Sequence, residues 1–530
     1  MSSESSSYPS GSSSASALTS SPELLLWSWS LCKGVTLSLG AAAAISLLGL
    51  KLTQPKKRTD VIAFMHPVAK DGGGGERVLW CAMRSIMKHK PEATIVLFTD
   101  LPSRPASVTS MGSASSLSSE CSSSSDSEEE EDFWSQYMID RALNKFGVEL
   151  TSKIKVVQLK RTSALDPSKY PRFTLLLQSL SSVVVGFEAL YKLIPRVYVD
   201  TCGVPFVLPL ARFLGCNTAC YVHYPVISTD MLRRVKDRKL MYNNKQTGLV
   251  RTYVKTAYYK LFALLYGCVG TFAQVCMTNS SWTRGHIKEI WWKFWWKNSY
   301  GPLRVFPPCN TEDLVQIPLK GATRNVKKPL ILSIGQFRPE KAHEVQLDAY
   351  ALALKQAQSS PSTLKSILQS KLVMVGGCRN DADKQRVELL RRKAEALGIA
   401  DHVEIHVNVP YSEIKDLLSQ AVVGIHTMVD EHFGIGVVEY MAAGVVAVAN
   451  NSGGPASDII VPLRDEKTGS LQATGYLAST EDEYASALVN ALCISEKERE
   501  KMCVAARSSI QRFSEQNFDE SFANALDRIL

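Results

Sequence analysis

The sequence predicts an α/β fold built from two Rossmann-like domains, with a cleft between them and a transmembrane helix before them. Two series of short apolar runs alternate with helical patterns of roughly ten or more residues, which is typical of parallel sheets. A polar stretch that ends at Lys328 separates the two series. Because ligands of such sheets bind beyond the carboxyl ends of the strands, we expect the functional site in the cleft between the domains.

The N-terminal segment differs from the rest of the 530-residue chain. Residues 1–23 are rich in serine and are expected to form a disordered tail. Residues 24–50 are apolar apart from Lys33, and this length suffices for a transmembrane anchor. A cleaved signal peptide is the alternative, although such peptides usually open with a basic stretch, which this N-terminus lacks.

The distribution of basic residues predicts a topology and disfavours one class of partner. Basic side chains follow the apolar segment, at Lys51 and from Lys56 to Arg58. The positive-inside rule therefore predicts a single-pass protein with a lumenal N-terminus and cytosolic domains. Elsewhere the lysines and arginines behind the formal net charge of +9 are scattered, which favours anionic small molecules or a membrane surface over nucleic acid. The twelve cysteines form no CxxC pair, which favours buried free thiols over a zinc site.

The N-terminal Rossmann-like domain is expected to span residues 59–315. Its predicted strands are the apolar runs at residues 61–66, 94–98, 154–159, 196–200 and 219–223. A glycine loop after the first run leads into a helix from Glu76. Residues 103–132 end in SSSSDSEEEED and show no apolar periodicity, so we expect a disordered insert there.

The C-terminal Rossmann-like domain is expected to span residues 326–505. Its predicted strands are the runs at residues 330–335, 371–377, 402–407, 422–426 and 445–450. Residues 506–530 predict a final helix that packs back toward the N-terminal domain.

The segment EHFGIGVVEYMAAG, residues 431–444, carries two carboxylates eight positions apart. Gly434 and Gly436 allow a close approach of the backbone to a ligand, and the N–H groups at the start of the following helix can bind a phosphate. Glu439 can reach past that phosphate to a sugar hydroxyl, and Glu431 can reach a group on the other side. This setting favours a nucleotide sugar over two solvated glutamates beside an ordinary helix cap.

Two further segments add charged and polar groups to the predicted cleft. In GQFRPEKAH, which begins at Gly335, the cations Arg338 and Lys341 follow a strand and could stabilise the charge on a departing diphosphate. A solvated surface pair is the alternative. His223 falls at the end of a strand and could contact a sugar hydroxyl, unless it is a structural histidine. The glycine run at residues 72–75 matches neither a dinucleotide fingerprint nor an NTPase phosphate loop.

Several segments together resemble the retaining glycosyltransferases of family four, which have the GT-B fold. They are residues 72–82, 222–231, 279–287, 335–343 and 431–444. The resemblance runs from about Val61 to near the C-terminus and omits the insert. It implies retaining transfer of mannose from GDP-mannose, in α-1,2 linkage, to a dolichol-diphosphate-linked oligosaccharide in N-glycan precursor synthesis. It also implies the cytosolic face of the endoplasmic reticulum membrane, no metal and no cofactor, and other mannosyltransferases of the pathway as candidate partners.

The same resemblance implies a role for each motif residue. Donor-binding residues would be Glu439 at the ribose, with Gly335, Gly434, Ile435 and Gly436 around the diphosphate. Catalytic residues would be Arg338 and Lys341 at the diphosphate, with Glu431 and His223 at the mannose. Gly74 and Gly75 would form the loop that borders donor and acceptor. A same-face substitution is the usual proposal for such enzymes, and a covalent bond to Glu431 is the competing one.

Alternatives to this function stay open on the sequence. One is an inactive relative that serves as a scaffold, and another is a glycosyltransferase that takes a different nucleotide sugar and a lipid acceptor. The residues themselves do not distinguish guanine from uracil.

Residues 256–297 predict contact with a membrane, because Tyr258–Met277 is strongly apolar and a tryptophan cluster follows it. The cluster is WWKFWWK, in which Trp291, Trp292, Trp295 and Trp296 alternate with lysines and a phenylalanine. Tryptophan and lysine gather at membrane interfaces, so we expect this segment to enter the headgroup region and present a lipid-linked acceptor. A buried helix with an aromatic core corner is the alternative.

Overall fold

The computed structural model describes most of the two predicted domains. The described residues are 59–69, 73–102, 125–228, 231, 249–291, 301–319, 324–359, 365–465 and 468–530. They fall within one compact unit, Lys57–Leu530. The expected tail at residues 1–23, the transmembrane segment at residues 24–50 and most of the insert at residues 103–132 lie outside the described residues. Trp292, Trp295 and Trp296 lie outside them as well.

The N-terminal domain contains a seven-stranded parallel sheet with the strand order β3-β2-β1-β4-β5-β6-β7. The strands are β1 (Val61–Met65), β2 (Thr94–Thr99), β3 (Lys155–Gln158), β4 (Val197–Asp200), β5 (Asn217–Val222), β6 (Val275–Thr278) and β7 (Leu303–Arg304). Every residue of β1 and of β4 is buried, as expected for a parallel sheet covered on both faces.

The described part of this domain contains six α-helices, one of which overlaps the disordered insert predicted at residues 103–132. They are α2 (Gly74–His89), α3 (Ser125–Phe146), α4 (Thr174–Lys192), α5 (Leu208–Phe213), α7 (Leu249–Gly270) and α8 (Ser281–Trp291).

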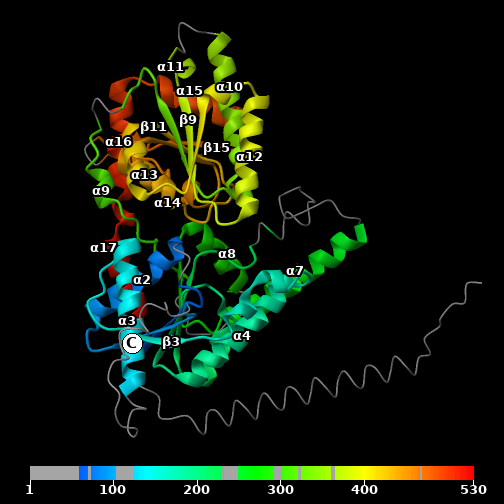
Figure 1. The fold of residues 1–530 in the computed structure, drawn as a ribbon, viewed down its shortest axis with the longest axis vertical. Coiled ribbons are helices and arrows are strands. Elements are labelled where there is room, and N and C mark those ends of the chain that lie inside the picture. The colour runs from blue at the N-terminus through cyan, green and yellow to red at the C-terminus, as the bar shows by residue number, and fades with distance from the viewer. Residues whose placement is uncertain are drawn as a thin grey trace, which may run out of the picture. The chain divides into compact units, whose positions relative to one another are not determined.

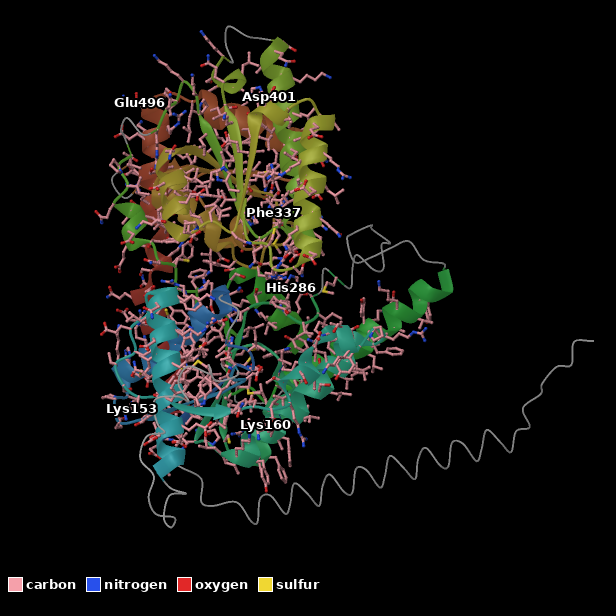
Figure 2. All side chains as sticks on the ribbon, viewed as in Figure 1. Lys153, Lys160, His286, Phe337, Asp401 and Glu496 are labelled. Atoms are coloured by element: carbon pink, nitrogen blue, oxygen red, sulfur yellow. The ribbon has the colours of Figure 1, made fainter. Side chains whose placement is uncertain are left out.

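The disorder predicted up to residue 132 was wrong for residues 125–132, which form the first turns of α3. The acidic run lies at a helix N-terminus, where negative charge is favourable. Buried Trp134, Met138 and Ala142 supply the apolar face further along. Lys153, labelled in Figure 2, pairs with Asp132 at 2.9 Å.

The predicted membrane-associating segment, residues 256–297, is divided in the structure. After α7 ends, apolar residues form β6 inside the sheet, where all four positions are buried. Trp291 is 4 % exposed and packs edge-on against Tyr266, with ring centroids 5.5 Å apart. The prediction was wrong for β6 and Trp291 because these apolar side chains complete the domain core. The outer side of α7 keeps large exposed apolar residues: Tyr253, Val254, Leu261, Leu264 and Leu265.

Helix α4 lies beside α7 (Figure 1), joined by a hydrogen bond from the Leu176 N–H to the Tyr258 hydroxyl. Among the described residues, α4 is the one helix long and apolar enough to cross a membrane, and a third of its apolar window is buried. A core helix of a soluble protein can have the same length and composition. Its residues split between a buried side and a side that carries exposed Leu177, Leu180 and Val184.

The C-terminal domain contains a six-stranded parallel sheet with the strand order β10-β9-β8-β11-β12-β15. The strands are β8 (Leu330–Ile334), β9 (Lys371–Gly376), β10 (Val403–Val407), β11 (Ala421–His426), β12 (Val446–Asn450) and β15 (Tyr476–Ala478). Short strands β13 (Leu463–Arg464) and β14 (Leu471–Gln472) form a separate antiparallel pair. The helices are α9 (Glu312–Val315), α10 (His343–Ser359), α11 (Lys365–Leu368), α12 (Asp381–Ala396), α13 (Tyr411–Gln420), α14 (Ile435–Ala443), α15 (Glu481–Cys493) and α16 (Glu496–Ser509). Two parallel-sheet Rossmann-like domains confirm the predicted α/β class.

The last helix, α17 (Glu515–Leu526), packs against α2 of the N-terminal domain. Arg84 on α2 pairs with Asp519 at 3.0 Å and with Glu515 at 2.6 Å. Phe522 stacks on Phe64 of β1, with ring centroids 6.4 Å apart, and so belongs to the core of the N-terminal domain. The chain therefore returns to its first domain after completing the second.

Candidate active site

The loops that follow β1, β5, β8 and β11 enclose a pocket of about 270 Å³ between the two domains. From the N-terminal domain the lining residues are Gly74, Gly75, Val78, His223, Asn279 and Pro307. From the C-terminal domain they are Ile334, Lys341, His426, Glu431, His432, Phe433, Gly434, Ile435 and Gly436. The pocket therefore brings together eight residues that the sequence analysis named: Gly74, Gly75, His223, Lys341, Glu431, Gly434, Ile435 and Gly436.

Glu431 is the central charge of this pocket. Its Oε2 accepts hydrogen bonds from Lys341 Nζ at 2.5 Å and from His426 Nε2 at 3.1 Å. Burial alone would raise the pKa of Glu431, but the His426 hydrogen bond and the Lys341 charge outweigh it and hold that pKa well below its usual range. Glu431 is therefore an ionised carboxylate throughout the physiological pH range.

Glycines and a strained residue fix the backbone around Glu431. Asp430 has a φ of 56°, a left-handed conformation, and its N–H donates to the Ser452 hydroxyl at 2.7 Å. The Gly454 N–H donates to the Glu431 carbonyl at 2.7 Å. A Cβ on Gly453 would lie 2.2 Å from the same carbonyl oxygen, so only glycine allows this contact. The glycine turn at residues 452–454 thus sets the position of the carboxylate.

Helix α14 begins at the pocket. Gly434 is its N-cap, with φ 107°, a conformation that glycine adopts without strain. The first N–H groups of a helix have no partner within the helix and carry partial positive charge. Those of Ile435 and Gly436 therefore offer an anion site next to the Lys341 ammonium, as the sequence analysis expected for a phosphate.

Lys341 closes a short 3-10 turn, Pro339–Lys341, after β8. Its carbonyl accepts a hydrogen bond from the Thr427 hydroxyl at 2.9 Å, which ties the turn to the end of β11. A Cβ on Gly335 would lie 3.8 Å from the Lys341 side chain, so Gly335 borders the same turn. Arg338 is not part of the pocket lining, and its guanidinium lies 3.7 Å from Glu340. Among the described residues, the buried Nε of Arg338 has no hydrogen-bond partner.

The N-terminal domain contributes a glycine loop and a histidine. A Cβ on Gly74 would lie 3.1 Å from Ile435 of α14, and a Cβ on Gly75 would lie 3.6 Å from His223 Nε2. His223 Nε2 lies 3.0 Å from the Thr201 carbonyl, to which it donates, so Nδ1 is the acceptor nitrogen of the ring. Burial lowers the pKa of His223 to about 4, and the ring is therefore neutral near pH 7.

Glu439 lies outside the pocket lining, one turn into α14. Burial raises the pKa of Glu439 to about 7, against the opposing charge of Arg77. The two glutamates of the motif therefore differ: Glu431 is held ionised, whereas Glu439 titrates close to physiological pH.

The pocket also contains two histidines that were not predicted from the sequence. His426 hydrogen-bonds Glu431, and its Nδ1 is buried without a partner among the described residues. His432 stacks on Tyr224 with ring centroids 5.1 Å apart and also contacts Trp282, whose ring lies 4.2 Å from His286 (labelled in Figure 2). His426 ends a parallel strand, and this position was the available signal. Within the described part of the chain, no group of three His, Cys, Asp or Glu side chains could hold a metal ion.

Two family profiles match most of the chain. Residues 59–115 and 122–291 match the family described as ALG11 mannosyltransferase N-terminus. Residues 319–509 match the family described as glycosyl transferases group 1. The second match begins after β7, the last strand of the first sheet, and before β8 of the second sheet.

Proteins named as mannosyltransferases resemble the chain along most of their length. A GDP-Man:Man(3)GlcNAc(2)-PP-Dol α-1,2-mannosyltransferase of Homo sapiens is 40% identical over 478 residues, which cover 89% of this chain and 88% of that protein. Proteins of the same name from Dictyostelium discoideum and Caenorhabditis elegans are 40% and 33% identical, over 87% and 90% of this chain and 83% and 92% of theirs.

Solved structures share the fold at low sequence identity. Anabaena Alr3699/HepE in complex with UDP and glucose has a TM-score of 0.52 at 14% identity, and the match covers 89% of this chain and 100% of that one. OtsA in its apo form has a TM-score of 0.57 at 12% identity, covering 89% and 99%. These likenesses support a two-domain GT-B arrangement of the sheets.

Proposed function

Since the chain belongs to the family of GDP-Man:Man(3)GlcNAc(2)-PP-Dol α-1,2-mannosyltransferases, we propose that it transfers mannose from GDP-mannose, in α-1,2 linkage, to a dolichol-diphosphate-linked oligosaccharide. The observation that carries this proposal is the Lys341–Glu431 ion pair, which lies at the N-terminus of α14 in a pocket between the domains. Anion site, cation and carboxylate lie within one pocket of about 270 Å³.

The donor diphosphate binds at the start of α14. The N–H groups of Ile435 and Gly436 face it, and Lys341 can donate to it because an ammonium has three donors, of which Glu431 uses one. We assign Arg338 as a second cation although it lies outside the pocket lining, because its buried Nε has no hydrogen-bond partner among the described residues. Gly335 leaves room beside Lys341. These groups stabilise the negative charge that grows on the leaving GDP.

Glu431 faces the mannose and stabilises the positive charge that develops at its anomeric carbon. Its low pKa and its two hydrogen bonds on Oε2 make it a weak base and a weak nucleophile, which favours an electrostatic role over a covalent one. The leaving phosphate then takes the proton of the acceptor hydroxyl on the same face of the sugar. His223 offers the neutral Nδ1 to a mannose hydroxyl, and Glu439 holds the ribose hydroxyls.

Dolichol is a lipid, so the acceptor lies in a membrane. A membrane anchor fits the proposed reaction for this reason. Residues 24–50 supply the predicted single transmembrane helix, with a lumenal N-terminus and the two domains on the cytosolic face of the endoplasmic reticulum. The exposed apolar residues of α7 give the N-terminal domain a second contact with the same membrane. Gly74 and Gly75 then border donor and acceptor from the membrane-bound domain.

The test is a transfer assay with the purified full-length protein in detergent. GDP-mannose, UDP-glucose and UDP-N-acetylglucosamine are each supplied with a short-chain analogue of the lipid-linked Man(3)GlcNAc(2) acceptor. We expect mannose transfer from GDP-mannose alone, and a product that an α-1,2-specific mannosidase cleaves back to the acceptor. Transfer from a UDP-sugar, or no transfer by folded protein, would contradict the proposal.

A further inference from the structure

Asp458 of the C-terminal domain binds the first turn of α8 in the N-terminal domain. Its Oδ2 accepts a hydrogen bond from the Ser281 N–H at 2.7 Å, and its Oδ1 accepts one from the Ser281 hydroxyl at 2.6 Å. Ser281 is the first residue of α8, so its N–H has no partner within the helix. The carboxylate also lies at the positive end of the helix dipole. Asp458 is therefore a helix cap that one domain supplies to the other.

The carboxylate of Asp458 is buried, and most of its partners belong to the N-terminal domain. The residue is 3% exposed, and its Oδ2 also accepts the Ser457 hydroxyl at 2.8 Å. Arg304 Nη1 lies 3.5 Å from Oδ1 and donates to the Ser281 hydroxyl at 2.8 Å. A buried carboxylate is costly unless hydrogen bonds and positive charge replace its water. Separation of the domains would leave the carboxylate with only Ser457 among these partners.

The turn that carries Asp458 leads directly to the C-terminal side of the donor pocket. This turn is π-helical and spans Pro455–Ile459. The Gly454 N–H, directly before it, donates to the Glu431 carbonyl at 2.7 Å. A Cβ on Gly434, the N-cap of α14, would lie 3.3 Å from the first residue of the turn. The segment of Asp458 therefore supports both the pocket carboxylate and the start of α14.

Ser281 leads in the same way to the N-terminal side of the donor pocket. Asn279, two residues before it, lines the pocket, and its side-chain amide donates to the His223 carbonyl at 2.7 Å. A chain of short contacts thus crosses the domain interface from Glu431 through Asp458 to His223. Its two ends are the side chains that the proposed function assigns to the mannose.

The Asp458 contact lies beside both points where the chain passes between the domains. Arg304 precedes the first passage, and Arg512, which precedes the second, donates to the Asp458 carbonyl at 2.7 Å. The two passages are joined by the Cys309 N–H, which donates to the Phe513 carbonyl at 3.0 Å. A contact beside these passages moves little when the domains rotate, so it can fix the angle between them.

We propose that Asp458 is a positioning residue: by capping α8 across the domain interface, it holds Glu431 and His223 at the separation that mannose transfer requires. The inference rests on the proposed function, because it takes these two side chains to face the mannose. The groups assigned to the diphosphate and the ribose all lie in the C-terminal domain. Loss of the Asp458 carboxylate should therefore slow transfer without weakening GDP binding.

The test measures transfer kinetics and GDP affinity of full-length Asp458→Ala. We expect kcat for mannose transfer to fall about tenfold or more, because small misplacements of reacting groups are costly. GDP affinity, measured by calorimetry, should stay within about twofold of that of the unmodified protein. In Asp458→Asn the amide can accept the Ser281 N–H and donate to the Ser281 hydroxyl, so kcat should recover to within about threefold.

Asn380→Ala is the matched control, because it removes a helix cap within one domain. The Asn380 side chain caps α12 by accepting the Asp383 N–H at 3.0 Å. Its loss should lower the melting temperature and keep kcat within about twofold of the unmodified protein. The inference is overturned if Asp458→Ala loses no more kcat than Asn380→Ala. A loss of GDP affinity that matches the loss of kcat also overturns it, since Asp458 would then act within its own domain.

Hydrogen exchange tests the interdomain contact without an activity assay. In Asp458→Ala, peptides that cover the first turn of α8 and the loop of His223 should exchange about tenfold faster, whereas Asn380→Ala should leave both unchanged. Exchange equal to that of the unmodified protein would show that Asp458 does not join the domains. Faster exchange in Asp458→Ala, together with no mannose transfer by the unmodified protein, would contradict the proposed function alone.

Discussion

Lys341 Nζ lies 2.5 Å from Glu431 Oε2, and this ion pair joins the turn after β8 to the loop after β11. Both side chains are mostly buried, at 24% and 13% exposure. Desolvating two charges costs much of what their attraction returns, so a largely buried pair in a cleft indicates function more than stability.

Lys341→Ala tests the role of this pair. Removing the ammonium takes away a donor to the leaving diphosphate, and we expect kcat/KM for GDP-mannose to fall by about 100-fold or more. Lys371→Ala is the control, because Lys371 also lies 2.5 Å from a glutamate, Glu404, but in an exposed pair. That control should keep kcat/KM within about twofold of the unmodified protein. Equal kinetics of the two variants would remove Lys341 from the chemistry.

The titration of Glu439 predicts a pH dependence of donor binding. Its folded pKa, raised to about 7, means that the carboxylate which accepts ribose hydroxyls forms only as the pH rises through that value. If the ionised form binds, GDP affinity measured by calorimetry should rise about tenfold between pH 6 and pH 8. In Glu439→Gln the affinity should be lower and should show only the slope that the titration of GDP itself causes. A steep slope retained in Glu439→Gln would assign the pH dependence elsewhere.

Gly434→Ala tests the anion site at α14. An alanine at φ 107° is strained, and its Cβ would lie 3.3 Å from Pro455, so we expect the N–H groups at the start of α14 to shift. We expect GDP affinity to fall about tenfold and the free energy of unfolding to fall by about 1–2 kcal/mol. Gly398→Ala carries similar strain, with φ +68°, in open space at a turn in the same domain. The Gly398→Ala variant should lose comparable stability and keep its GDP affinity. If Gly398→Ala also lost GDP affinity, backbone strain alone would explain the effect of Gly434→Ala.

Asp519→Ala tests the contact of α17 with the N-terminal domain. The Asp519 carboxylate accepts from Arg84 and Lys88, and its removal leaves the largely buried Arg84 with only Glu515. We expect the free energy of unfolding to fall by about 3 kcal/mol in chemical denaturation. Asp313→Ala breaks the exposed pair with Lys415 and should cost less than about 0.5 kcal/mol. If both variants unfold at the same denaturant concentration, α17 does not stabilise the domain in this way.

Strands with continuous apolar runs could be predicted, because a buried parallel strand differs clearly in composition from its surroundings. β1 and β11 are examples. β6 was missed because its four residues continue the apolar run of α7, so no change of composition marks the boundary. The acidic start of α3 was missed because the apolar face of that helix begins only at Phe133 and Trp134.

The candidate site was predictable where glycines and charged residues follow strands, since topology alone brings those ends together. Lys341 and Glu431 are 90 positions apart and meet for this reason. Sequence could not show that His426 would share Oε2 of Glu431, because this depends on how far the loop after β11 folds back. Nor could it separate the pKa values of Glu431 and Glu439, which depend on burial and on neighbours from other loops.

The most direct measurement is an experimental structure of the full-length protein bound to GDP-mannose. We predict the diphosphate on the N–H groups of Ile435 and Gly436 within hydrogen-bonding distance of Lys341, and the mannose between Glu431 and His223. A donor bound elsewhere, or a complex in which Lys341 and Glu431 lie apart and face away from it, would contradict the central claim.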